Sequence, residues 1–387
     1  MAAQRRFKIL YFTYFAALGA VLPYQVLFFE RKGLSFTQIG VIGSAAAAAA
    51  IPLGLLWVNW SDRAGKRRPF IAFGFISQIA LWLGISAASG FWAFLLLMLL
   101  ASILVPPLEA LLNVVVLAGS DETRKGTEYS LVRVWGSVGW IVSAAVGGAL
   151  VQSIELRFSF FFGSALLALC VVQQFGSEPH GSGSANGRRR EATRLGREVS
   201  FLAATLIREL SVGIAYAFLS IYLDKIGTPY WLLGWAWAIS ALPELPIMVL
   251  AGRASDRIGR NPLLIAGFAC SSAMGYAYSV VRTPVLAVPL MSLSGISFGL
   301  SHIASVGFMA DIAPHNRQAM AQGVYVVLTT NVPRVAGPFL GGLILDRMGL
   351  AALFSTSGTL SLISAVILAP RWLSSRGTDP KGHHEST

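Results

Sequence analysis

Charge is scarce in this sequence, and its scarcity excludes an ordinary soluble protein. Only 12% of the 387 residues are charged, about half the share of a typical soluble domain, while 55% are hydrophobic. Cysteine is rare too: Cys170 and Cys270 both fall in apolar stretches, so neither a disulfide framework nor a metal site is predicted. The sequence also lacks H-E-x-x-H, a nucleophile elbow and a P-loop. We therefore expect neither an enzyme nor a bound cofactor.

Long apolar runs make up much of the chain. A helix needs about 17–25 apolar residues to cross a bilayer, and twelve stretches of roughly this length occur. They are too continuously apolar for barrel strands, in which polar and apolar residues alternate. The predicted fold is an all-α membrane protein with twelve transmembrane helices. The stretches are 7–29, 36–59, 70–88, 91–118, 130–152, 157–175, 200–223, 230–252, 262–281, 284–310, 322–345 and 350–370.

The net charge of +12 is a topology signal rather than a sign of nucleic-acid binding. With the N-terminus in the cytoplasm, the segments predicted to lie inside hold 21 Lys and Arg residues, and the outside loops hold six. This bias follows the positive-inside rule and predicts that both termini are cytoplasmic. We expect a multi-pass protein of the cytoplasmic (inner) membrane, surrounded by lipid and without a nucleic-acid partner.

The sequence divides into two related halves. The stretch F-F-E-R-K-G-L-S-F-T-Q-I-G at 28–40 matches Y-L-D-K-I-G-T-P-Y-W-L-L-G at 222–234. The same offset of 194 residues relates S-D-R-A-G at 61–65 to S-D-R-I-G at 255–259. A constant offset indicates two bundles related by an axis along the membrane normal. The predicted domains are an N-terminal six-helix bundle at 1–175, a Gly/Ser-rich and then basic cytoplasmic linker at 176–199, a C-terminal six-helix bundle at 200–370 and a cytoplasmic tail at 371–387.

Twelve spans, a central cytoplasmic loop and a charged D-R-x-G turn after the second and eighth spans resemble the major facilitator superfamily over essentially the whole chain. The resemblance implies two pseudo-symmetric six-helix bundles. In that family the turn closes the cytoplasmic side by joining Asp and Arg side chains to neighbouring helix ends. One departure is visible, because the glycine usually found four residues before the Asp is Gly252 in the second copy but Val58 in the first. The gating residues implied here are Asp62, Arg63, Arg67, Asp256, Arg257 and Arg260.

Six charged side chains remain inside the predicted spans. A charge within the membrane is costly unless it is paired or faces water, so each is a candidate functional residue. The alternatives are a structural ion pair between helices or, for Arg208 in particular, snorkelling to the membrane surface. The six are Glu109, Arg133, Arg208, Glu209, Glu244 and Arg334.

Glu109 and Arg133 are placed to meet. Glu109 lies about ten residues before the cytoplasmic end of the fourth span, and Arg133 lies about one turn inside the fifth. Because these spans are antiparallel neighbours joined by a short loop, the two side chains can pair in a central cavity. Asn113, one helical turn after Glu109, would point into the same cavity.

This pattern resembles the lactose-type proton symporters and the phenylpropionate-type permeases. Those groups share an acidic residue followed by Ala in the fourth span and an R-x-[FW]-G-x-V-G-like segment in the fifth. The resemblance implies that Glu109 and Arg133 bind the solute and that Trp140, seven residues after the arginine, stacks on it. The alternative for Trp140 is packing against lipid or a neighbouring helix.

The second half departs from the lactose-type pattern. His302 matches that group's histidine in the tenth span, but Ser305 stands where those symporters carry the proton-bearing glutamate. We therefore expect Glu244 and Glu209 to carry the proton, with His302 as a relay and Arg334 as the charge that responds. A carboxyl group buried in an apolar bundle suits reversible protonation. The alternative for His302 is a satisfied donor in the core.

The sequence thus predicts a monomeric secondary active transporter that takes up a small organic solute, such as a sugar, nucleoside or aromatic acid, with protons by alternating access. A channel would instead need rings of like residues or a filter. Antiporters of the superfamily usually carry Gly-Pro in the fifth span, whereas here Gly337-Pro338 lies in the eleventh, which favours symport. Two alternatives stay open: proton-driven efflux of a drug or metabolite, and a non-transporting sensor on the same scaffold.

Overall fold

A computed structural model describes residues 2–65, 67–105, 107–118, 125–174, 198–312 and 327–376. All regular secondary structure in these ranges is helical. The predicted linker lies outside them except for its last two residues. Of the predicted tail, only 371–376 is described, as the end of a helix.

The described helices follow one another along the chain with short connections. In the first half they are α1 (Ala2–Arg31), α2 (Phe36–Ala64), α3 (Arg68–Ala87), α4 (Phe91–Leu104), α5 (Leu108–Ala118), α6 (Lys125–Ser153) and α7 (Phe158–Gln174). In the second half they are α8 (Glu198–Tyr216), α9 (Leu219–Lys225), α10 (Tyr230–Ala241), α11 (Glu244–Ile258), α12 (Arg260–Val280), α13 (Pro284–Ile312), the π-helix η1 (Val327–Asn331) and α15 (Val332–Arg376).

The helices are membrane-spanning in length and composition. Ten described helical segments are long and apolar enough to cross a bilayer, and Phe158–Gln173 is a shorter apolar helix. The longest segment, Thr329–Ala369, is broken at Gly349, whose φ of 82° lies in the left-handed region that glycine tolerates. Each of the twelve predicted stretches falls on one or more of these helices. Helices are the expected solution because a bilayer offers backbone groups no other hydrogen-bond partner.

Three of the predicted spans are interrupted near their middles. The fourth span ends as α4 at Leu104 and resumes as α5 at Leu108, across a segment that contains two prolines. The eighth is divided by Leu242 and Pro243 into α10 and α11. The seventh is divided between α8 and α9. Proline lacks an N–H and its ring clashes with the preceding turn, which explains the first two breaks. The prediction that prolines bend the fourth span is therefore confirmed.

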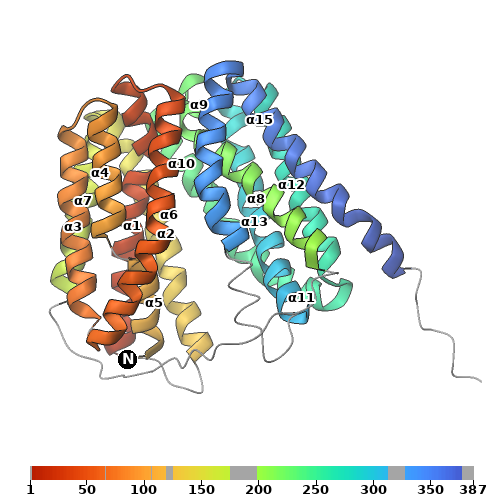
Figure 1. Cartoon of the computed structure of the whole chain (residues 1–387), viewed down its shortest axis with the longest axis horizontal. Helices are drawn as coiled ribbons and strands as arrows, with labels where there is room; N and C mark the ends of the chain where they lie inside the picture. Colours follow the sequence, from red (N-terminus) through yellow and green to blue (C-terminus); the bar gives the residue numbers. More distant parts are fainter. Residues whose placement is uncertain are drawn as a thin grey trace, which may run out of the picture.

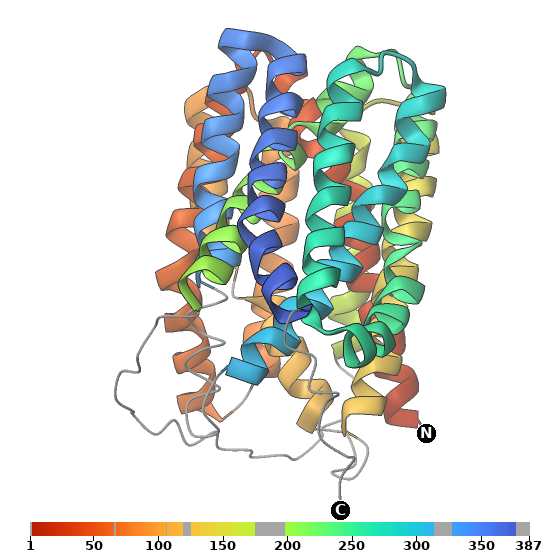
Figure 2. The ribbon, with the colours of Figure 1, turned by 90° about the vertical axis from the view of Figure 1, so that its right-hand side faces the viewer.

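The two halves of the chain form two groups of helices. Figure 1 shows the first half in red to yellow beside the second half in green to blue. In the first half α1 packs on α6 and α7, and in the second α15 packs on α8 and α12, which Figure 2 shows from the side of the second half. Contacts between the halves run mainly from α2 to α15 and from α6 to α10, with a smaller one from α1 to α9. The ribbons diverge toward the end where α1 begins (Figure 1).

Two glycines allow the halves to approach closely. A Cβ added at Gly40 of α2 would lie 2.3 Å from the carbonyl oxygen of Pro338 in α15. A Cβ added at Gly234 of α10 would lie 2.2 Å from the carbonyl oxygen of Ala144 in α6. Both members of the first pair are 194 residues from their counterparts in the second, so the internal repeat extends to the interface.

Candidate functional site

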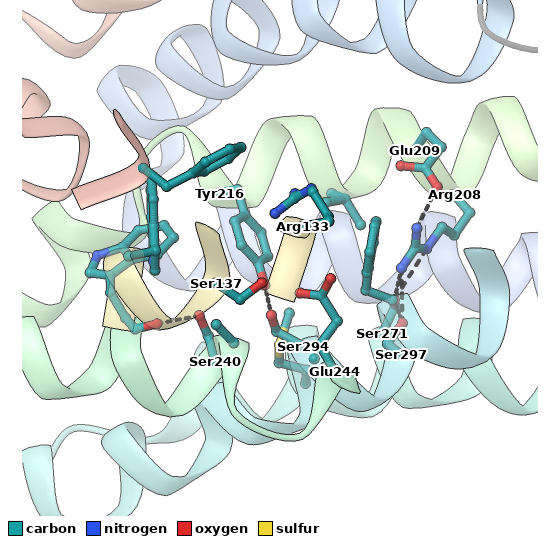
Figure 3. A pocket seen from close by; sticks show the side chains of 18 residues that line it. Arg133, Ser137, Arg208, Glu209, Tyr216, Ser240, Glu244, Ser271, Ser294 and Ser297 are labelled. Atoms are coloured by element: carbon teal, nitrogen blue, oxygen red, sulfur yellow. Dashed lines mark hydrogen bonds and ion pairs between the residues drawn. The ribbon is translucent and has the colours of Figure 1, made fainter. Parts of the chain in front are cut away.

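A cavity of about 400 Å³ lies between the two halves, and we call it the interhalf cavity. The first half contributes side chains from α1 and α6, and the second half contributes side chains from α8 and α10 through α13. Its charged side chains are Arg133, Arg208, Glu209 and Glu244, which Figure 3 labels together with the polar groups around them. The remaining lining residues are Phe15, Ser137, Trp140, Val212, Tyr216, Trp237, Ser240, Ala241, Ser271, Met274, Ser294, Gly295, Ser297 and Phe298.

Arg133 and Glu244 reach the interhalf cavity from opposite halves. The Arg133 guanidinium lies over the Phe15 ring, 4.4 Å from its centroid. Glu244 occupies the first turn of α11, just after the break at Pro243, where the positive end of a helix dipole favours a carboxylate. In Figure 3 the Glu244 side chain extends into the cavity toward Arg133, and the two groups interact electrostatically. The described contacts contain no direct ion pair between them, so both retain hydrogen-bonding capacity.

Arg208 is held in a polar cage at another part of the cavity. Its side chain is 4% exposed and forms an ion pair with the carboxylate of Glu209, which is 26% exposed. Its Nη2 donates to Ser297 Oγ at 2.9 Å and to Ser271 Oγ at 3.4 Å. A buried cation is tolerable only with such partners, and four hydrogen-bonding directions of the guanidinium are used here. Snorkelling to the surface, the alternative for Arg208, is therefore excluded by its burial.

Aromatic rings form the walls of the cavity. Trp140 of α6 and Trp237 of α10 pack edge to face across the two halves, with centroids 6.5 Å apart. Tyr216 packs against Trp237 at 5.8 Å, and its hydroxyl donates to Ser294. Trp237 is itself fixed, because its Nε1 donates to Ser220 Oγ at 3.0 Å. Rings held this way offer flat apolar faces beside the charged groups, a combination that suits a solute with a ring and polar substituents.

Glu109 and Asn113 line a different space, a second pocket of about 470 Å³. Asn113 accepts a hydrogen bond from the Tyr11 hydroxyl. Arg334, from the first turn of α15 after η1, lines the same pocket from the second half of the chain. The other lining side chains include Tyr14 and Gln78. Glu109 and Arg334 therefore bring opposite charges to one pocket from opposite halves.

The expected pairing of Glu109 with Arg133 is not present among the described side chains. The break at Val105 to Pro107 makes α5 a separate short helix, and Glu109 in its first turn lines the second pocket. The guanidinium of Arg133 is instead stacked on Phe15 in the interhalf cavity. The sequence argument assumed one continuous fourth span, and the interruption is the reason that the two side chains line different pockets.

The other predicted site residues are spread over two regions. His302 is exposed and stacks on Phe298, whose ring lines the interhalf cavity, at a centroid distance of 5.0 Å. Among the predicted gating residues, Arg260 donates to Ser255 Oγ and lies against Gly307 of α13. Arg63 and Arg257 are exposed and Arg67 is half-buried. The side chains of Asp62 and Asp256 lie outside the described part of the structure.

Sequence reasoning missed several lining residues. Ser294 and Ser297 were detectable, because together with Ser301 they recur three and four residues apart in an apolar span and so lie on one helix face. Tyr216 and Trp237 carry no comparable signal. They line the cavity because α8 ends at Tyr216 and because α10 packs against α6.

Comparison with known proteins gives consistent matches over nearly the whole chain. Residues 4–356 match the family described as "MFS_1 like family". The maltose permease of Geobacillus stearothermophilus is 23% identical over 374 residues, covering 95% of this chain and 94% of that protein. A probable 3-phenylpropionic acid transporter of Escherichia coli is 25% identical over 319 residues, covering 78% and 80%. The crystal structure of the nucleoside transporter NupG superposes with a TM-score of 0.79 at 19% identity, covering 98% of this chain and 100% of that one.

Proposed function

We propose that this chain, which belongs to the MFS_1 like family, is a secondary active transporter that takes up a small organic solute together with protons. The observation that carries the proposal is the interhalf cavity, in which Arg133 of the first half and Glu244 of the second reach into one space between aromatic walls. A single site built from both halves is what alternating access requires, because a rocking motion then exposes it to one side at a time.

The solute is a sugar, a nucleoside or an aromatic acid. Each offers a ring face to Trp140 and hydrogen-bonding groups to Arg133 and Glu244. The two curated relatives described above are named for a sugar and for an aromatic acid, and the superposed structure is named for a nucleoside. Glu109 and Asn113 contribute polar contacts from the second pocket, along the route by which the solute enters or leaves.

Glu244 is the main proton carrier in this proposal. Glu209 is already neutralised by Arg208, whereas no ion pair within the described structure neutralises Glu244. A carboxyl group without a fixed counterion can be neutral in one state and charged in the other. His302 relays protons toward Glu209, and Arg334 responds to the charge of Glu109 in the second pocket.

The protein works as a monomer in the cytoplasmic membrane with both termini in the cytoplasm. The ribbons then diverge toward the cytoplasm, and the contacts between the halves close the outer side (Figure 1). The conserved geometry of the D-R-x-G turns in the resembling superfamily makes Asp62, Arg63, Arg67, Asp256, Arg257 and Arg260 the groups that would close the cytoplasmic side in the opposite state.

Uptake into proteoliposomes tests the proposal. Purified protein is reconstituted, and labelled sugars, nucleosides and aromatic acids are supplied outside, with and without an inward proton gradient. We expect one class to accumulate, and its accumulation to depend on the gradient. Accumulation only with an outward-directed drive would favour the alternative of efflux. Saturable binding to the detergent-purified protein without any flux would favour a sensor. Neither binding nor flux of any class would contradict the proposal.

A further inference from the structure

The closed end of the molecule carries two ion pairs between the halves, and they are related by the internal repeat. Arg31, the last residue of α1, bonds both carboxylate oxygens of Asp224 in α9 through Nη2, at 2.9 and 3.1 Å. Lys225 bonds Glu30 in return, with 2.7 Å between Nζ and Oε1. Glu30 and Asp224 are 194 residues apart, and so are Arg31 and Lys225. Each half therefore presents an acid followed by a base, and each acid pairs with the base of the other half.

Two helix caps repeat the same exchange. Asp346 of α15 accepts hydrogen bonds from the backbone N–H groups of Phe36 and Thr37 at the start of α2, at 3.1 and 2.6 Å. Gln152 of α6 accepts one from the backbone N–H of Tyr230 at the start of α10, at 2.8 Å. Gln152 and Asp346 are again 194 residues apart. The first N–H groups of a helix have no partner within the helix, so each half completes a helix of the other half.

The exposed fractions of these side chains show which groups depend on the contact. Glu30 is 13% exposed and Asp224 is 14% exposed, whereas Arg31 and Lys225 are 57% and 49% exposed. If the halves separate, the two carboxylates and the N-termini of α2 and α10 exchange these partners for water. The contact is therefore reversible, and its strength falls with salt because the cations are accessible to solvent.

We infer that these six side chains form a reciprocal latch, and that the latch sets the balance between the conformation closed at this end and one open at it. The six are Glu30, Arg31, Gln152, Asp224, Lys225 and Asp346. The inference rests on the proposed function in one respect, namely that the two halves rock about the interhalf cavity. Breaking the latch then exposes that cavity to the other side of the membrane, and the solute's access depends on residues that do not touch it.

The two halves of the latch are unequal. Asp346 accepts from two backbone groups and adds a negative charge at a helix N-terminus, while Gln152 accepts from one and is neutral. Removing the Asp346 side chain should therefore open this end more than removing that of Gln152. Asp346→Gln, which copies the residue at the equivalent place of the first half, should retain most of the closure that Asp346→Ala loses.

Pulsed spin-label distance measurement tests the latch without any solute. Cys170 and Cys270 are replaced by Ser, and labels are placed at Ser89 and Thr283, exposed residues at this end of the two halves. Arg31→Asp should shift the population ratio toward longer distances by about tenfold, the size expected for losing a hydrogen-bonded charge pair. Arg31→Asp combined with Asp224→Arg should restore the distance distribution, because the pair is rebuilt with its charges exchanged.

The matched control is an ion pair at the same end that does not join the halves. Arg157 pairs with Glu155 within the first half, so Arg157→Asp should leave the distances unchanged. The latch is wrong if Arg31→Asp behaves like this control, or if the exchanged pair does not restore closure. Asp346→Ala compared with Asp346→Gln gives a second reading should the charge reversal fail to fold. Normal distance shifts in a protein that moves no solute would overturn the proposed transport while leaving the latch intact, and normal transport without distance shifts would do the reverse.

Discussion

Arg133 and Glu244 face one cavity from opposite halves of the chain, and the described contacts place no ion pair between them. Each is positioned by its own half: Arg133 by stacking on Phe15, and Glu244 by the start of α11 after Pro243. Opposite charges held apart in this way cost less than isolated charges and still leave donors and acceptors for a ligand. A solute bound between them would also feel any relative movement of the halves.

Glu244→Gln should abolish uphill accumulation while solute exchange across the membrane continues. Glutamine retains the size and a hydrogen-bonding oxygen but cannot take up or release a proton in this range. Accumulation and counterflow are measured in the same proteoliposomes, with Glu155→Gln as the control because Glu155 is an exposed residue far from the cavity lining. Unchanged accumulation would remove Glu244 as the proton carrier.

Arg133→Lys should raise the half-saturating solute concentration about tenfold, equivalent to about 1.4 kcal/mol. Lysine keeps the charge, but it cannot stack a planar group on Phe15 or present two parallel N–H donors. Initial uptake rates over a range of solute concentrations measure the change. An affinity equal to that of the unmodified protein would mean that only the charge of Arg133 matters, and Arg133→Gln would then be the variant that fails.

Glu109→Gln tests the second pocket. Hydrogen bonds to a charged group are worth about 1.5–3 kcal/mol, so loss of the carboxylate should weaken solute binding at least about tenfold if the solute contacts Glu109. Equilibrium binding to purified protein measures the change directly. Wild-type binding together with wild-type transport would confine the solute to the interhalf cavity and leave Glu109 without a role in recognition.

Ser297→Ala should destabilise the fold rather than change recognition. Ser297 accepts a hydrogen bond from Arg208 at 2.9 Å, and removing it leaves part of a buried guanidinium unsatisfied at a cost of about 1–3 kcal/mol. Thermal unfolding in detergent measures the loss. Ser301→Ala is the matched control, because Ser301 is buried one turn away and bonds the Ser297 carbonyl rather than Arg208. Equal unfolding temperatures for the two variants would argue against a structural role for the cage.

Much of the architecture could be predicted from periodicity and composition. Apolar runs of bilayer length, the 194-residue repeat and the D-R-x-G turns led to an all-α membrane protein of the major facilitator type, and the helices and the family match confirm it. The division into domains at 176–199 stays a prediction, since nearly all of that segment lies outside the described residues. The assigned roles of the site residues stay predictions as well.

The positions of charged side chains relative to one another were harder to predict. The sequence placed Glu109 beside Arg133 because their spans are neighbours, yet the interruption before α5 puts Glu109 in the second pocket with Arg334. The prolines were visible in the sequence, but the direction in which a broken span continues depends on the helices packed around it. Arg208 illustrates the same limit, because its two serine partners lie 63 and 89 residues away in the chain.

The sequence by itself determined that this chain crosses the membrane many times, that its two halves are copies, and which charges the membrane must accommodate, because all three follow from local composition and repetition. Only the tertiary structure decided which of those charges share a cavity. It also turned the acid–base dipeptides of the two halves into a reciprocal pair of ion pairs, since that depends on how one bundle lies against the other. Contacts between copies are set by packing geometry, which no window of sequence contains.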